Sequence, residues 1–184
     1  MTNAAPLKPG PRARRIGNML RVDHAGEYGA VAIYRGQRAV FDKLPNKARM
    51  AELLKEMEDG EAHHLETFDR LLAERKIRPS LLSPFWNAAG FGLGAATALM
   101  GEKAAMACTE AVEDVIEKHY AEQIGELENI EPELAGTVRQ FREDELEHKA
   151  TAEEEGARSA PGYRLLSAMI KAGCRTAIKI AEKV

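Results

Sequence analysis

The sequence has few aromatic residues, only two cysteines and no stretch in which apolar and polar residues alternate. Phe, Trp and Tyr together make up 5% of the 184 residues. Alternation at every second residue marks a half-buried strand, so its absence argues against a sheet protein. Cys108 and Cys174 lie too far apart for a thiolate metal motif, and two cysteines make no disulfide framework. We therefore expect an all-α protein from a reducing compartment.

The chain also lacks an excess of basic residues and an apolar leader. The formal net charge is −3, which gives no general attraction for nucleic acid, and we expect no such partner. The N-terminal segment has no apolar core of a secretory signal. Its basic residues lie among Pro6, Pro9 and Pro11, which would break an amphipathic targeting helix. We expect residues 1–13 to form a disordered basic arm and residues 14–184 to form one domain.

Charged residues are absent from residues 79–101. The stretch is long enough to span a bilayer, but glycine, proline and alanine make it a poor membrane helix. Its glycine pattern resembles a dinucleotide-binding fingerprint, yet no strand precedes it. We expect a hydrophobic crossover that packs on the rest of the domain or touches a membrane surface. The candidates for lipid contact or substrate access are Leu81, Leu82, Phe85, Trp86 and Phe91.

One spacing of possible metal ligands occurs twice. Residues 61–64 and 145–148 each place a Glu three residues before a His, so both side chains lie on one face of a helix. A further Glu precedes each segment, by 34 residues at Glu27 and by 32 residues at Glu113. The candidate metal ligands are therefore Glu27, Glu61, His64, Glu113, Glu145 and His148.

These six residues fall on the apolar faces of four expected helices, at about 14–42, 46–75, 102–128 and 131–157. An ionised carboxylate buried alone costs several kcal/mol, and no Lys or Arg recurs on these faces. Two metal cations would supply the missing charge, and oxygen with imidazole ligands favours iron or manganese. The second and third of these helices must run parallel if the halves repeat, which requires a long crossover. The pattern predicts a ferritin-like four-helix bundle with two helix-pair repeats, the hydrophobic crossover, and a basic amphipathic helix after residue 162.

Other polar residues near the candidate ligands leave alternatives open. His24 lies one turn before Glu27 and either hydrogen-bonds a ligand or packs in the core. His119 and Tyr120 follow the third helix's ligand, and Tyr120 either lines the cavity or is an ordinary core residue. Glu110 and Glu117 are rival ligands on that helix, but neither holds the apolar-face position.

The motifs resemble those of the demethoxyubiquinone hydroxylases (3-demethoxyubiquinol 3-hydroxylases) of ubiquinone biosynthesis. The run RVDHAGEYGA at residues 21–30 is long and specific, and the two ExxH segments, AVE at 111–113, HY at 119–120 and AGCR at 172–175 extend the resemblance to the end of the chain. The resemblance implies a di-iron centre on the six candidate ligands, with no departure at any of them.

The resemblance also implies the reaction and its setting. Two irons would use O₂ and electrons from NADH to hydroxylate the ring of a prenylated methoxy-benzoquinol. Such a substrate lives in the bilayer, so we expect peripheral contact with the cytoplasmic side of a bacterial inner membrane, or with the mitochondrial inner membrane for a processed organellar form. A lipid-binding accessory protein and other ubiquinone-biosynthesis enzymes are the expected partners. The sequence leaves open whether the chain forms a homo-oligomer.

Rival functions exist for the same bundle. An iron-storage protein would require a polar channel and a cage-forming surface, and a peroxide scavenger often carries a Cys₄ module that is absent here. A non-enzymatic lipid-binding bundle would explain the apolar surfaces but not four buried carboxylates. A radical-generating reductase subunit would need a longer chain.

Overall fold

The computed structural model describes residues 10–183, and this range is helical without any strand. The α-helices are α1 (Pro11–Phe41), α2 (Ala48–Glu74), α3 (Ser83–Leu99), α4 (Glu102–Leu127), α5 (Pro132–Glu154) and α6 (Tyr163–Ala181), and two short 3-10 turns lie at Pro45–Lys47 and Ala157–Ser159. The all-α prediction is therefore confirmed.

The helix boundaries lie close to the expected ones, with one difference at the start. α1 begins at Pro11 rather than at Arg14. Proline suits the first turn of a helix because its fixed φ is helical and its missing N–H would have had no partner there. The last residues of the expected disordered arm are therefore helical, and residues 1–9 lie outside the described part of the chain.

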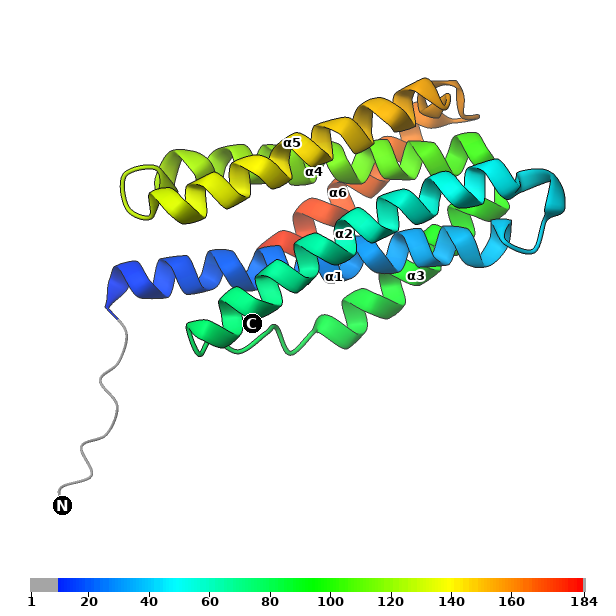
Figure 1. Cartoon of the computed structure of the whole chain (residues 1–184). Coiled ribbons are helices and arrows are strands. Elements are labelled where there is room, and N and C mark those ends of the chain that lie inside the picture. The colour runs from blue at the N-terminus through cyan, green and yellow to red at the C-terminus, as the bar shows by residue number, and fades with distance from the viewer. Residues whose placement is uncertain (1–9, 184) are drawn as a thin grey trace, which may run out of the picture.

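The helices form two antiparallel hairpins joined by a crossover (Figure 1). α1 and α2 make the first hairpin, and α4 and α5 make the second. α3 returns along the bundle after α2, so α4 runs parallel to α2. The expected crossover is thus present, and it is a helix. The core of α1, α2, α4 and α5 is a ferritin-like four-helix bundle.

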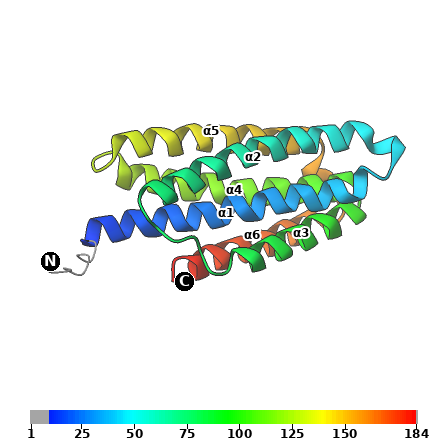
Figure 2. The ribbon, with the colours of Figure 1, turned by 60° about the horizontal axis from the view of Figure 1, so that its bottom comes forward.

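Three layers of helices are visible when the molecule is viewed from below (Figure 2). α2 and α5 form one outer layer, α1 and α4 the middle layer, and α3 and α6 the other outer layer. α1 is covered by α2 on one side and by α3 on the other, which explains why it is buried on more than one stripe. The crossover and the last helix therefore lie on the side of the bundle opposite α2 and α5.

Glycines allow α3 to pack directly on the backbone of α1. A side chain at Gly94 would overlap the carbonyl oxygen of Ile33, and one at Gly36 would overlap that of Phe91. At these crossing points only a residue without a Cβ permits the observed approach. The glycine-rich stretch that resembles a nucleotide fingerprint is thus a helix-packing surface.

Two apolar clusters fill the bundle, one toward each end. The first includes Phe41, Leu54 and Met106. The second includes Leu20, Phe68 and further residues of α4 and α5. On each of the four core helices, the candidate ligands lie between the segments that contribute to these clusters. The polar residues therefore form a layer across the middle of the bundle, with apolar packing above and below.

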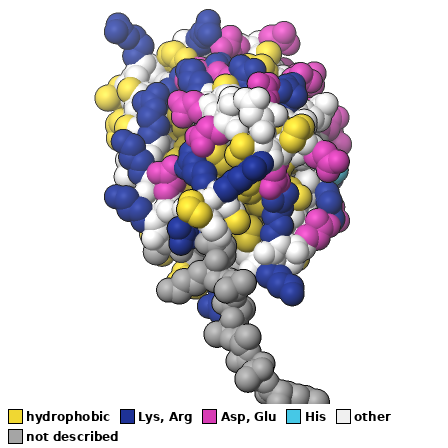
Figure 3. Space-filling model, turned by 90° about the vertical axis from the view of Figure 1, so that its left-hand side faces the viewer, with side chains coloured by type: hydrophobic (Ala, Val, Ile, Leu, Met, Phe, Trp, Pro, Cys, Tyr) yellow, Lys and Arg dark blue, Asp and Glu magenta, His cyan; other side chains and the backbone are white. Residues whose placement is uncertain are grey.

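The surface at the end of the bundle where α1 begins carries both signs of charge (Figure 3). Lys, Arg, Asp and Glu side chains all lie on this face, with Lys and Arg prevailing along its left edge in the view. Within residues 10–183, every helix is too short or too polar to cross a membrane.

Candidate metal centre

The structure brings all six sequence-predicted ligands together in the middle of the bundle. Two groups of four side chains can each offer one ligand atom, and the atoms of a group lie within 4.8 Å of one another. One group contains Glu27 and His64, and the other contains Glu113 and His148. Both groups share Glu61 and Glu145 from α2 and α5. One carboxylate comes from each of the four helices.

The imidazole Nδ1 atoms point toward the shared carboxylates. His64 Nδ1 lies 3.3 Å from Glu145 Oε1 and 3.6 Å from Glu61 Oε2. His148 Nδ1 lies 2.9 Å from Glu61 Oε1 and 3.7 Å from Glu145 Oε2. The distance from His64 Nδ1 to Glu27 Oε2 is 3.8 Å. The i,i+3 spacing of each ExxH segment thus aims one oxygen and one nitrogen at the same point, as the helical geometry requires.

Several buried atoms of this cluster have no hydrogen-bond partner among the described residues. They are Oε2 of Glu27, Glu61 and Glu113, both carboxylate oxygens of Glu145, and Nδ1 of His64. Buried polar atoms almost always have partners, so a group of unpaired atoms around one point calls for an explanation. Carboxylate oxygens and imidazole nitrogens are donors that iron and manganese accept. The residues therefore fit two metal ions.

The electrostatics of the cluster favour positive charge at its centre. Burial and the Glu61 carboxylate raise the pKa of Glu27 well above its ordinary value, and burial and Glu145 do the same for the pKa of Glu113. Burial alone would lower the pKa of His148, but the adjacent carboxylates of Glu145 and Glu61 raise it to about 10. Without cations, the cluster therefore retains protons. The positive charge of these protons takes the place of the charge that bound metal ions would supply.

Two buried tyrosines hold the carboxylates that are not shared. The Tyr34 hydroxyl donates to Glu113 Oε1 at 2.7 Å, and the Tyr120 hydroxyl donates to Glu27 Oε1. Burial and the nearby carboxylate raise the pKa of each phenol, so each keeps its proton and remains a donor. Tyr120 therefore contacts the cluster, which resolves one open alternative. Tyr34 was not among the residues singled out from the sequence.

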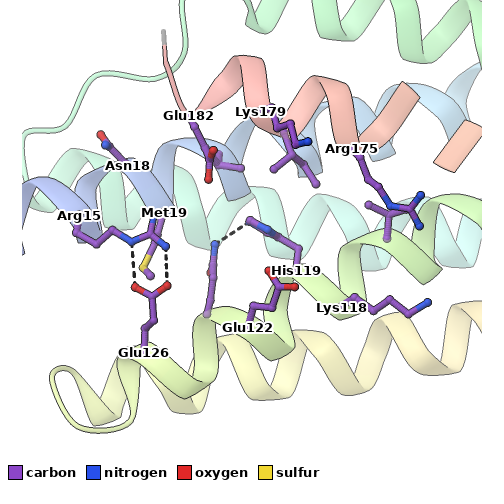
Figure 4. Close-up of a pocket in the computed structure, with 14 residues that line it drawn as sticks. Arg15, Asn18, Met19, Lys118, His119, Glu122, Glu126, Arg175, Lys179 and Glu182 are labelled. Atoms are coloured by element: carbon purple, nitrogen blue, oxygen red, sulfur yellow. Dashed lines mark hydrogen bonds and ion pairs between the residues drawn. The ribbon is translucent and has the colours of Figure 1, made fainter. Parts of the chain in front are cut away.

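The two other histidine candidates do not touch the six ligands. His24 Nε2 lies 2.9 Å from Asp69 Oδ1 on α2 and forms no hydrogen bond with Glu27. His119 lies beside a surface cavity of about 380 Å³ between α1, α4 and α6 (Figure 4). There it accepts from Gln123, and its Nε2 lies 3.3 Å from Asp23 Oδ1.

The walls of this cavity carry both signs of charge and include an ion pair between Arg15 and Glu126. The cavity is distinct from the centre on which the six ligands converge, because none of those ligands lines it.

The rival carboxylates on α4 face away from the centre. Glu110 is buried but pairs with Lys171 at 3.3 Å and accepts from Tyr163 at 3.1 Å. Glu117 pairs with Arg142 on α5 at 3.2 Å. Both carboxylates are thus compensated by protein cations, in contrast to Glu113. Glu113, which the sequence places on the apolar face of this helix, is the carboxylate of α4 that lies at the centre.

Sequence reasoning missed one acidic residue that orients a candidate ligand. Asp144 Oδ2 lies 3.1 Å from His64 Nε2, on the side of the ring opposite the centre. A carboxylate behind a ligating histidine fixes the ring orientation and increases its basicity. The signal available in the sequence was the position of Asp144 directly before Glu145.

Comparisons with known proteins agree with the motifs. Residues 14–181 match the family model described as ubiquinone biosynthesis protein COQ7. A 3-demethoxyubiquinol 3-hydroxylase of Rhodospirillum rubrum is 49% identical over 179 residues, which cover 97% of this chain and 82% of that protein. A mitochondrial NADPH-dependent 3-demethoxyubiquinone 3-hydroxylase of Mus musculus is 45% identical over a region that covers 91% of this chain and 77% of that protein. A mitochondrial 5-demethoxyubiquinone hydroxylase of Saccharomyces cerevisiae is 42% identical, with coverages of 94% and 80%.

Proposed function

Because the chain belongs to the ubiquinone biosynthesis protein COQ7 family, we propose that its six clustered Glu and His residues hold the metal pair of a demethoxyubiquinol hydroxylase. The chain is a 3-demethoxyubiquinol 3-hydroxylase, an enzyme of ubiquinone biosynthesis. The observation that carries the proposed metal pair is the convergence of unpaired buried ligand atoms on two adjacent points. Membership of this family favours hydroxylation over iron storage and peroxide removal, the rival functions of such a bundle.

We assign the ligands by the two groups that the side chains form. Glu27 and His64 would hold one iron, Glu113 and His148 would hold the other, and the carboxylates of Glu61 and Glu145 would reach both. When bound, a reduced iron pair supplies the electrons that activate O₂ for insertion of one oxygen atom into a ring C–H bond. The other oxygen atom leaves as water. A reduced nicotinamide dinucleotide would supply two electrons per turnover; the resemblance implies NADH, whereas the mouse relative is named for NADPH.

The protein's own residues would orient the ligands and keep the site dry. The hydroxyls of Tyr34 and Tyr120 fix one oxygen each of Glu113 and Glu27, which leaves the second oxygen of each carboxylate directed to the centre. The apolar clusters on both sides of the polar layer exclude water from it. Exclusion of water strengthens the electrostatic interactions within the site and protects a reactive oxidant.

We further propose that the α3–α6 layer contacts the membrane in which the quinol is dissolved. Of the five candidate residues on the crossover, Leu81, Phe85 and Phe91 are exposed, with 80% of Leu81 accessible. Leu82 and Trp86 are half-buried, and Trp86 packs against a small cluster formed by Val22, Ala25 and Ala181.

On α6, Leu165 and Met169 add exposed apolar surface, and Arg164, Arg175 and Lys179 add exposed positive charge. Lys171 on the same helix turns inward and pairs with Glu110 and Asp114. Apolar side chains beside basic ones suit an anionic lipid surface. We place the enzyme peripherally on the inner membrane, on the cytoplasmic side in a bacterium, and expect a lipid-binding accessory protein to assist transfer of the quinol.

The double variant Leu81→Ser/Phe85→Ser is expected to bind vesicles of anionic phospholipid at least about tenfold more weakly than the wild type, because each buried Leu or Phe contributes roughly 1.5–3 kcal/mol. Sedimentation with vesicles measures the partition. The matched control is Leu44→Ser, which removes an exposed leucine from the α1–α2 loop and should leave binding unchanged. Equal binding by the double variant and the wild type would show that residues 81–85, at the junction with α3, do not enter the lipid.

The metal pair is tested directly on purified protein. Anaerobic reconstitution with Fe²⁺ should yield about two irons per chain, as a two-metal centre requires. The loaded enzyme, given O₂, a reduced nicotinamide dinucleotide and demethoxyubiquinol, should form the hydroxylated quinol, detected by mass spectrometry. Protein that remains folded by circular dichroism but holds less than one iron per chain would refute the proposed centre.

A further inference from the structure

The two halves of the centre differ in what stands behind each histidine. The internal repeat places Asp144 directly before Glu145 and Gly60 directly before Glu61. Because α2 and α5 run antiparallel, the residue at this position on one helix lies against the histidine of the other. Asp144 Oδ2 thus lies 3.1 Å from His64 Nε2, and Asp144 in turn accepts from Gln140 at 3.1 Å. His64 is therefore held from outside by a carboxylate.

His148 has no such support. A Cβ built on Gly60 would lie 3.4 Å from both Cε1 and Nε2 of His148, so the glycine backbone lies directly beside the ring. Within residues 10–183, no hydrogen bond to His148 Nε2 is formed; the ring's hydrogen bond is made by Nδ1, toward Glu61. The equivalent of the Asp144 carboxylate is absent because glycine has no side chain.

The solvent exposure of the two histidines also differs. The side chain of His148 is 15% exposed, whereas those of His64, Glu27, Glu61 and Glu145 are at most 2% exposed. Among these ligands, His148 is therefore the one whose ring is partly exposed to solvent, beside Gly60, in the layer formed by α2 and α5. This layer lies on the side of the bundle opposite α3 and α6, so the exposed part of His148 is separate from the proposed membrane face (Figure 2).

From these two observations we infer that the metal positions are unequal, and that the ion held by Glu113 and His148 is the one that enters last and leaves first, past Gly60. The inference rests on the proposed metal pair. Loss of the carboxylate behind a metal-bound histidine typically weakens metal binding by roughly 10–100-fold. The same ratio is expected between the two positions of this protein, and Gly60 and Asp144 are the positioning residues that set it.

The test follows iron release from the anaerobically loaded enzyme, with ferrozine as the chelator and its Fe²⁺ complex as the readout. The wild type should release one iron quickly and the second at least about tenfold more slowly. Asp144→Ala should bring both irons to the fast rate, because both histidines then lack a carboxylate. Gly60→Asp should bring both toward the slow rate, because its carboxylate would start from a Cβ in contact with His148. Gly60→Ala is the control, which adds the Cβ without an acceptor and should keep two phases.

The outcomes separate the inference from its premise. Failure to load iron at all contradicts the metal pair itself. Release of two irons in one phase by the wild type overturns the inequality, even if hydroxylation is normal. A Gly60→Ala variant that slows the fast phase as much as Gly60→Asp also overturns it, because packing rather than the hydrogen bond would then control release.

Discussion

Glu61→Ala is expected to remove iron from both positions and to lower hydroxylation by roughly a thousandfold or more, because the reaction has no route without the metal pair. Glu61 belongs to both ligand groups, so its loss affects both ions at once. It is also fully buried and close to both histidines, through Nδ1 of His148 at 2.9 Å and Nδ1 of His64 at 3.6 Å. Truncation therefore removes a shared anion and also the partner that orients an imidazole.

The readouts are iron content of the purified variant and a quinone profile of cells in which it replaces the natural protein. Glu110→Ala is the matched control, because Glu110 is a buried carboxylate of the same bundle that pairs with Lys171 outside the centre. The control should lose some stability but retain two irons and normal ubiquinone. Normal ubiquinone in the Glu61→Ala cells, without accumulation of the methoxy-lacking quinol, would contradict the role assigned to the centre.

The convergence of the six candidate ligands was predictable from the sequence because it depends on local geometry. The Glu and His of residues 61–64 and 145–148 lie on one face whenever each segment is helical. The six residues point into the bundle whenever the apolar face of each helix is buried. Those two conditions place Glu27 and Glu113 in the same layer. The long crossover followed from the parallel order of the second and third core helices, which the structure confirms.

Contacts between distant helices were not predictable in this way. The hydrogen bond from Tyr34 to Glu113 depends on how α1 rotates against α4, and the pairing of Lys171 with Glu110 depends on where α6 lies. His24 shares a face with Glu27, yet its ring meets Asp69 of α2 instead. The crossover was hard to assign as a helix because it lacks the polar face that gives a helical period. The glycines of the crossover pack against the backbone of α1. This contact between distant segments is not visible in the local sequence pattern.

The second prediction concerns the stability of Glu113→Gln. The change in stability that this variant causes should reverse its sign when metal is bound. In metal-free protein, Glu113→Gln is expected to stabilise the fold by on the order of 1–3 kcal/mol at pH 7, because it removes a buried acid from beside Glu145 and Glu61. Burial and these neighbours raise the pKa of Glu113, so at pH 7 the folded state takes up a proton that the unfolded state lacks. An acid with a raised pKa costs stability above its ordinary pKa, and this cost increases with pH. Glutamine is neutral in both states and avoids the cost, while its Oε1 can still accept from Tyr34.

With iron bound, the same variant should be the less stable protein. A ligand that binds only the folded state at a thousand times its Kd adds about 4 kcal/mol, which corresponds to a rise in Tm of roughly 8–16 °C for a chain of this size. Glu113→Gln loses an anionic ligand, so iron should raise its Tm by less than half the wild-type amount.

Urea unfolding in EDTA at pH 5 and pH 8, with Tm measured with and without iron, tests both signs. The stability advantage of metal-free Glu113→Gln should be larger at pH 8. Glu110→Gln is the control and should lower stability in both states, because it removes one of the two buried carboxylates that pair with Lys171. If metal-free Glu113→Gln were destabilised as much as that control, the carboxylates of the centre would not be strained without metal. Their convergence would then have to be explained by packing rather than by the cations they are arranged to bind.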